Sequence, residues 1–231
     1  METKIYEIFG TDALKESLQH LRQLKPISTR RRPAVTDLPI NRGGKTMILY
    51  INACVRQDSR TERLAEALLK QMDDDIQQVR LEDITFEKTD EAFLDKRDRL
   101  IEEGAFDHEM FALARQFAAA EQIVIAAPYW DLSFPAALKQ YMENVTVNGI
   151  TFVYTPEGIP SRLCKAQKLY YVTTVGGDYA PDEFGYGYIQ ALAGGYYGIT
   201  DTKLIKATGL DIVGADVEGI IEQCIEREIN I

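Results

Sequence analysis

Hydroxyl and guanidinium side chains gather in the segment from Asn52 to Thr61, directly after a continuous apolar run. Ser59 and Thr61 are residue types that cap helices, and the free N–H groups of a helix N-terminus bind anions. Arg56 and Arg60 add positive charge to the same segment. The segment therefore indicates a phosphate site, although a Ser59 that only caps a helix would explain the same pattern without a ligand.

Two glycine-based phosphate motifs are absent from the chain. No G-x-G-x-x-G follows the first apolar run, and no G-x-x-x-x-G-K-[ST] occurs anywhere. These absences disfavour a dinucleotide held in the Rossmann manner and a P-loop nucleotide. A hydroxyl-rich loop without glycines suits a terminal monophosphate, as in FMN. Cys54 in this loop could be a redox thiol, but a buried structural cysteine is the commoner case.

Aromatic and glycine residues follow two later apolar runs. Tyr129 and Trp130 lie between prolines, which stiffen a loop, and their faces could cover a planar ring. The alternative is that both aromatics pack in the core or in a dimer interface. Gly176 and Gly177 follow Thr174 and would let the backbone approach a ligand closely, although a tight turn needs them equally.

The elements that must position these loops alternate between strand and helix. Apolar runs predict the strands Met47–Ala53, Gln77–Leu81, Gln122–Ala127, Leu169–Thr174 and Lys203–Ala207. Helical spacing predicts the helices Thr61–Met72, Pro135–Asn144, Phe184–Tyr196 and Asp216–Glu228. A long stretch up to about Ala120 is also expected to be largely helical, with one apolar face formed by Phe106, Met110, Leu113, Ala114 and Phe117.

This alternation predicts an α/β fold in which helices cover both faces of a parallel sheet. Five strands fit the flavodoxin-like, doubly wound order 2-1-3-4-5 better than the longer dinucleotide fold. Ligands of such sheets lie beyond the carboxyl ends of the strands, at the point where the strand order reverses. Function is therefore expected in the loops after Ala53, Ala127 and Thr174.

Charge divides the chain into two regions. Residues 1–45 carry nine Lys and Arg against five Asp and Glu, a net charge of +4. Since the net charge of the whole chain is −10, the remaining residues carry −14. We expect residues 1–45 to form an N-terminal arm, with a possible short helix over Asp12–Leu24, and residues 46–231 to form the flavodoxin-like domain. Such an acidic domain would repel a nucleic-acid backbone.

The chain shows no membrane span and no secretory signal. Its three cysteines, Cys54, Cys164 and Cys224, are widely spaced, a pattern that fits neither a disulfide framework nor paired zinc ligands, and we expect a cytoplasmic protein. No catalytic triad, paired carboxylates or metal cluster is evident.

Together the three loops resemble those of the FMN-dependent NADH-azoreductase and quinone-reductase family, from about Thr46 to the C-terminus. The most specific match is the block APYWDLSFPAALKQYMENVTVNGITFVYTPEG, which ends at Gly158. The resemblance implies a homodimer in which FMN takes hydride from NADH or NADPH and passes electrons to quinones, azo compounds or flavins. It implies that cofactor binding involves Ser59, Arg60, Thr61, Pro128, Tyr129, Trp130, Asp131, Leu132, Thr174, Gly176 and Gly177.

Two positions depart from the family pattern. Asp131 stands where asparagine is common, and its negative charge beside a reduced flavin would tune the potential or the choice of substrate. Ala53 stands where serine is frequent, so one phosphate hydroxyl is missing. Tyr179 is a possible substrate-side residue. Two other interpretations stay open: a flavodoxin-like electron carrier that serves protein partners, and a flavin-sensing regulatory module.

Overall fold

The computed structural model describes residues 46–72 and 74–230, and the predicted N-terminal arm with its short helix lies outside them. A five-stranded parallel sheet has the order β2-β1-β3-β6-β7. Counted among the sheet strands alone, this is the predicted order 2-1-3-4-5, so the flavodoxin-like fold is confirmed. The strands are β1 (Met47–Asn52), β2 (Asp75–Arg80), β3 (Gln122–Ala126), β6 (Lys168–Thr174) and β7 (Asp201–Ala207).

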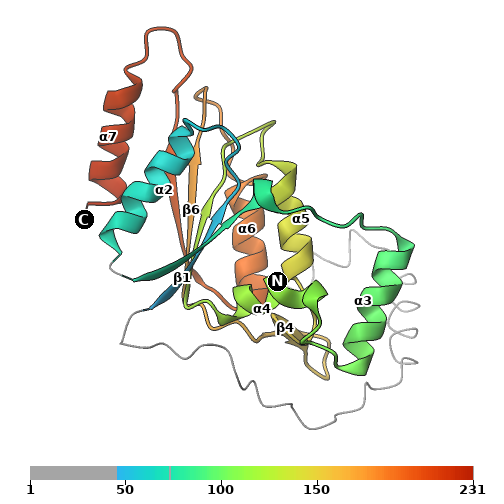
Figure 1. Ribbon diagram of the computed structural model, residues 1–231. Helices are drawn as coiled ribbons and strands as arrows, with labels where there is room; N and C mark the ends of the chain where they lie inside the picture. Colours follow the sequence, from blue (N-terminus) through green and yellow to red (C-terminus); the bar gives the residue numbers. More distant parts are fainter. Residues whose placement is uncertain (1–45, 73, 231) are drawn as a thin grey trace, which may run out of the picture. The chain divides into compact units, whose positions relative to one another are not determined.

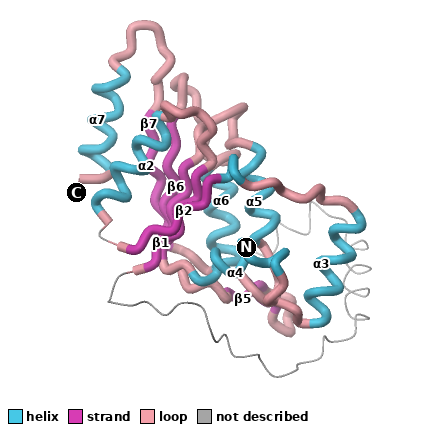
Figure 2. Tube along the Cα trace, in the orientation of Figure 1, coloured by secondary structure: helices cyan, strands magenta, loops and turns pink. Residues whose placement is uncertain are grey.

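Helices cover both faces of this sheet (Figures 1 and 2). α2 (Arg60–Gln71) and α7 (Val217–Glu228) pack on one face, against the strand residues Ile48, Val124 and Ile205. α4 (Ala112–Ala119), α5 (Ala136–Val145) and α6 (Tyr186–Leu192) pack on the other, against strand residues that alternate with the first set. Side chains buried on both faces explain why the central strands are continuous apolar runs in the sequence.

The predicted helical stretch before β3 is interrupted. α3 (Glu91–Glu103) ends at Gly104, whose φ of 69° is left-handed, and a short 3₁₀ helix, η2 (Glu109–Phe111), precedes α4. The prediction of one helical face from Phe106 to Phe117 is therefore wrong. Glycine adopts the left-handed conformation without steric strain and so ends α3.

Two further segments complete the described chain. The strands β4 (Phe152–Tyr154) and β5 (Pro160–Arg162) pair as an antiparallel hairpin outside the main sheet. α6 continues into a π-helical segment, η3 (Ala193–Tyr197), and another 3₁₀ helix, η1 (Leu81–Asp83), follows β2. Among the described residues, no helix has both the length and the apolar character needed to cross a membrane.

Candidate functional site

A cavity of about 350 Å³ lies where the loops after β1, β3 and β6 meet. The chain runs from β1 outward to β2 and returns to β3 on the other side of β1, so the strand order reverses here. This is the position at which open parallel sheets bind ligands. The cavity is lined by Val55, Arg56, Asp58, Ser59, Arg60, Thr61, Pro128, Tyr129, Trp130, Thr174, Val175, Gly176, Leu210 and Asp211.

A larger cavity of about 430 Å³ is lined by α3, α5, β4 and α6 rather than by the loops after the strands. Its cationic group, Arg97, donates to the carbonyl oxygens of Glu143 and Thr146, at 3.3 and 2.5 Å. Burial lowers the pKa of Arg97. Since these bonds already use the guanidinium, the cavity between the loops is the better candidate site.

The loop after β1 offers a row of free backbone donors. Ser59 is the N-cap of α2, and its Oγ accepts a hydrogen bond from the amide of Glu62 at 3.3 Å. Among the described residues, no hydrogen bond is formed by the backbone N–H groups from Val55 to Thr61. A helix N-terminus with unpaired N–H groups attracts anions. The loop therefore has the donor set that a phosphate monoester requires.

Two side-chain contacts hold this loop against its neighbours. Thr61 is buried at 1% exposure, and its Oγ1 lies 2.6 Å from Oγ1 of Thr174 at the end of β6. Arg60 donates to Asp211 Oδ1 at 2.7 Å and to the Leu210 carbonyl oxygen at 3.2 Å. The Asp211 carboxylate thus already forms an ion pair with Arg60, the arginine that the sequence analysis assigns to phosphate binding.

The aromatic loop after β3 contains a tight turn. The backbones of Trp130 and Ser133 exchange hydrogen bonds, at 3.1 and 2.7 Å, around Asp131 and Leu132. Both central residues have positive φ, 49° and 66°, as a type I′ turn requires. In the described part of the chain, their own N–H groups donate no hydrogen bond, which leaves them available to a ring heteroatom.

Tyr129 ties the aromatic loop to the loop after β6. Its amide donates to the Thr174 carbonyl oxygen at 3.1 Å, and its hydroxyl donates to that of Pro181 at 3.2 Å. Burial raises the pKa of this hydroxyl, and neighbouring groups, including Asp182, raise it further. The phenol is therefore held as a neutral wall of the cavity.

Gly176 lies under the loop that follows β7. A Cβ on Gly176 would come within 2.3 Å of Asp211 Oδ2, and its carbonyl oxygen accepts from the Asp211 amide at 2.8 Å. Asp211 and Leu210 line the cavity but were not among the predicted site residues. A Thr-Gly-Leu-Asp segment directly after a strand, residues 208–211, is the signal that would have pointed to them.

Most of the predicted binding residues meet at this cavity. Ser59, Arg60 and Thr61 line it, as do the three residues from Pro128 to Trp130 and the pair Thr174 and Gly176. Asp131, Leu132 and Gly177 belong to the adjoining turns but are not among the lining residues. Tyr179 is 78% exposed and also lies outside the lining. Their roles toward a ligand stay predictions.

Comparison with known proteins gives a consistent result. A family model described as flavodoxin-like fold matches residues 46–229. An FMN-dependent NADH:quinone oxidoreductase of Clostridium perfringens (strain ATCC 13124) is 35% identical over 195 residues, which cover 80% of this chain and 96% of that protein. FMN-dependent NADH:quinone oxidoreductase 2 of Clostridium acetobutylicum is 45% identical over 126 residues, covering 52% of this chain and 62%, less than two thirds, of that relative.

Solved structures with similar folds include two proteins from Bacillus anthracis. An azoreductase from strain Sterne has 23% identity and a TM-score of 0.68, with 80% of this chain and 97% of that one covered. An FMN-dependent NADH-azoreductase from strain Ames Ancestor, in complex with FMN, has 21% identity and a TM-score of 0.65, with 80% and 96% covered. At these identities the likeness shows the fold.

Proposed function

This chain belongs to the flavodoxin-like family of FMN-dependent NADH:quinone oxidoreductases, and we propose that it reduces quinones with electrons from NADH through bound FMN. The observation that carries the proposal is the cavity between the loops at the strand-order reversal, where free amides, hydroxyls and aromatic side chains converge. A relative named for this activity, matched over 96% of its length, supports it. Azo compounds, free flavins and NADPH are further reactants that we propose for testing.

The cavity has the chemistry that FMN needs. The unpaired N–H groups from Val55 to Thr61 and the Ser59 and Thr61 hydroxyls suit the phosphate. The unpaired N–H groups of Asp131 and Leu132 suit the polar edge of the ring system. A volume of about 350 Å³ falls within the usual range for small-molecule pockets, about 300 to 1,000 Å³. The residues present therefore fit this cofactor.

When bound, FMN supplies the hydride and electron chemistry, so the chain itself has to bind and orient. The loop from Val55 to Thr61 would fix the phosphate end, and Arg60 would exchange its Asp211 partner for that phosphate. Tyr129, anchored through its amide and hydroxyl, would keep one wall of the ring site rigid. Trp130, 39% exposed, would flank the opening through which NADH and then the quinone enter.

We also propose that the protein is a homodimer. The β4–β5 hairpin and its flanks present large apolar side chains that are at least 40% exposed: Val153, Tyr154, Ile159 and Leu163. Exposed large apolar side chains that gather on one segment are typical of a protein interface. Ile159→Asp should lower the mass measured by light scattering to that of one chain, whereas an unchanged mass would contradict this interface.

Cys54, Cys164 and Cys224 are buried and unpaired, which supports a reducing cytoplasm.

The activity can be tested with the purified protein. Anaerobic apoprotein is loaded with FMN, and the 450 nm absorbance is followed as NADH and NADPH are added separately. Bleaching by NADH, followed by recovery when 1,4-benzoquinone is added, is the expected result. Bound flavin that neither nicotinamide bleaches would support the carrier or sensor interpretation. Failure to bind FMN would contradict the proposal.

A further inference from the structure

The first turn of α2 has the sequence of a capping box but not its geometry. Ser59 and Glu62 have the S-x-x-E spacing in which the glutamate carboxylate normally accepts from the N-cap amide. Half of the box is formed, since the Ser59 Oγ accepts from the Glu62 amide. The other half is missing: within residues 46–72 and 74–230, the Ser59 amide donates to no acceptor. The Glu62 carboxylate is held elsewhere.

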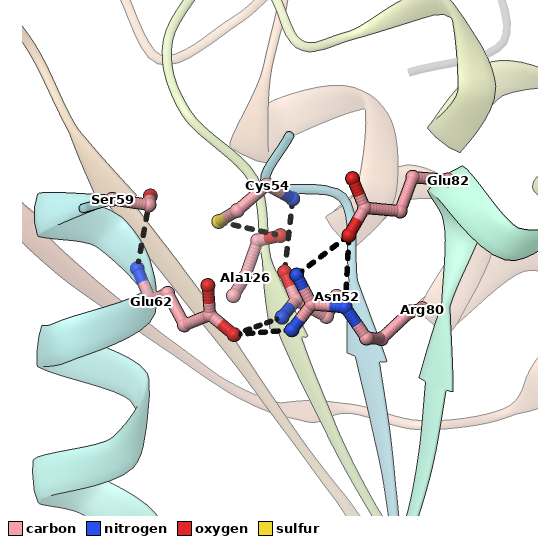
Figure 3. Close-up of polar contacts among 7 residues, drawn as sticks. All are labelled: Asn52, Cys54, Ser59, Glu62, Arg80, Glu82 and Ala126. Carbon is pink, nitrogen blue, oxygen red and sulfur yellow. Dashed lines mark hydrogen bonds and ion pairs between the residues drawn. The ribbon is translucent and has the colours of Figure 1, made fainter. Parts of the chain in front are cut away.

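Two side chains from the sheet hold that carboxylate (Figure 3). Asn52 Nδ2 and Arg80 Nη1 both donate to Glu62 Oε1, each at 2.7 Å. Asn52 and Arg80 are register partners at the ends of β1 and β2, so the sheet itself places them together. Asn52 is fully buried, and Glu62 has a side-chain exposure of 14%. The position of the carboxylate is therefore fixed by groups with little freedom to move.

The same network holds both ends of the loop. Asn52 Oδ1 accepts from the Cys54 amide at 2.9 Å, at the start of the loop, while Asn52 Nδ2 reaches Glu62 at its end. Arg80 also donates to Glu82 Oε1, at 2.8 and 3.0 Å. These ion pairs raise the pKa of Arg80, which therefore stays charged beside Glu62.

A carboxylate in the first turn competes with a bound anion for the same positive helix end. If Glu62 closed the capping box, it would take the Ser59 amide and place a negative charge beside the phosphate. We propose that Arg80 is a positioning residue for phosphate binding: it draws Glu62 toward β2 and offsets its charge, so that the Ser59 amide stays free. This inference rests on the proposed binding of FMN at the site.

The test compares FMN with riboflavin, which has the same ring system but no phosphate. Dissociation constants of both are measured by flavin fluorescence quenching with the apoprotein. For Arg80→Met we expect FMN binding to weaken at least tenfold and riboflavin binding to change less than twofold. The double variant Glu62→Gln/Arg80→Met should return FMN binding to within threefold of the wild type, because no carboxylate remains to close the box.

Arg63→Met is the matched control. It removes the same charge from the exposed face of α2, the helix that carries Glu62. Arg63 pairs there with Glu218 on the surface, and FMN binding should stay within threefold of the wild type. Glu62→Gln alone keeps a neutral acceptor for Asn52 and Arg80. It should tighten FMN binding twofold to fivefold and leave riboflavin binding unchanged. If Arg80→Met does not fold, this variant alone tests whether the Glu62 carboxylate opposes the phosphate.

Several outcomes would overturn the inference. Equal weakening of FMN and riboflavin in Arg80→Met would show that the network only supports the fold. Unchanged FMN binding in that variant, or weaker FMN binding in Glu62→Gln, would show that the carboxylate does not oppose the phosphate. A wild-type apoprotein that binds neither flavin would overturn the proposed function as well. Normal wild-type binding with unaffected variants would overturn only the role of Arg80.

Discussion

Replacing Thr61 with valine tests whether its hydroxyl serves the fold or the ligand. Valine keeps the shape and has a similar helix propensity, so the change replaces the hydroxyl with a methyl group and leaves the rest of the side chain as it was. That hydroxyl shares a 2.6 Å hydrogen bond with Thr174 in a residue that is 1% exposed. The net value of one such bond is about 1 kcal/mol, which lowers the melting temperature of a chain of this size by roughly 2 to 4 °C.

The effect on binding should be larger. A hydrogen bond to a charged phosphate is worth about 1.5 to 3 kcal/mol, so Thr61→Val should weaken FMN binding by about 10- to 150-fold. Riboflavin binding should change by no more than about threefold, since it lacks the phosphate that we propose the hydroxyl to bind. Fluorescence-quenching titrations of the apoprotein measure both constants, and thermal unfolding of the flavin-free protein measures the stability.

Thr202→Val provides the control for this experiment. Thr202 Oγ1 lies 2.7 Å from the Tyr186 hydroxyl. Thr202 belongs to the amino-terminal end of β7, whereas the cavity lies beyond the carboxyl ends of the strands. Its loss should lower stability without changing FMN binding. The reasoning is refuted when Thr61→Val binds FMN as tightly as the wild type, or loses FMN and riboflavin affinity equally.

Three more measurements probe the site. Asp211→Asn frees Arg60, so FMN affinity should rise by about twofold to fivefold, and an unchanged dissociation constant would argue against the exchange of partners. Asp131→Asn removes an exposed negative charge beside the ring site and should raise the midpoint potential of bound FMN by about 20 mV, measured against reference dyes; a lower potential would contradict this. Burial raises the pKa of Cys54 to about 11, so the folded protein keeps a proton that the unfolded chain loses from about pH 8.5. The free energy of unfolding should therefore fall between about pH 8.5 and 11, by about 1 to 3 kcal/mol, and the fall should be smaller in Cys54→Ala in chemical denaturation at each pH.

The sheet could be predicted because its signal is local. β1 and β3 are apolar at nearly every residue, and strands buried on both faces need this composition. The alternation with amphipathic helices then left few possible topologies. The hydroxyls at Ser59 and Thr61 were equally visible, since a cap and a phosphate site require the same residue types at the same helix end.

The remainder of the site depends on contacts between distant parts of the chain. Asp211 reaches the cavity from the loop after β7. It pairs there with Arg60, which lies 151 residues earlier in the chain, and no local pattern encodes this contact. Glu62 has the spacing of a closed capping box, yet Arg80 on the adjacent strand diverts it. The break after α3 was missed because apolar residues such as Phe106 continue the helical spacing past Gly104, although the backbone has already turned.

The turn at Asp131 and Leu132 shows how a local rule gives way at a site. A type I′ turn favours Asn and Gly at both central positions, and leucine in the left-handed conformation costs about 1 to 2 kcal/mol. Here Trp130 and Ser133 close the turn with two backbone bonds, and Ser133 Oγ donates to the Phe184 carbonyl oxygen at 2.6 Å. Bonds outside the turn thus maintain a strained backbone whose central N–H groups have no acceptor among the described residues. Backbone strain that the surroundings maintain in this way is typical of ligand-binding loops. We therefore expect the free N–H groups of this turn to serve the proposed flavin ring, which an ordinary hairpin turn would not do.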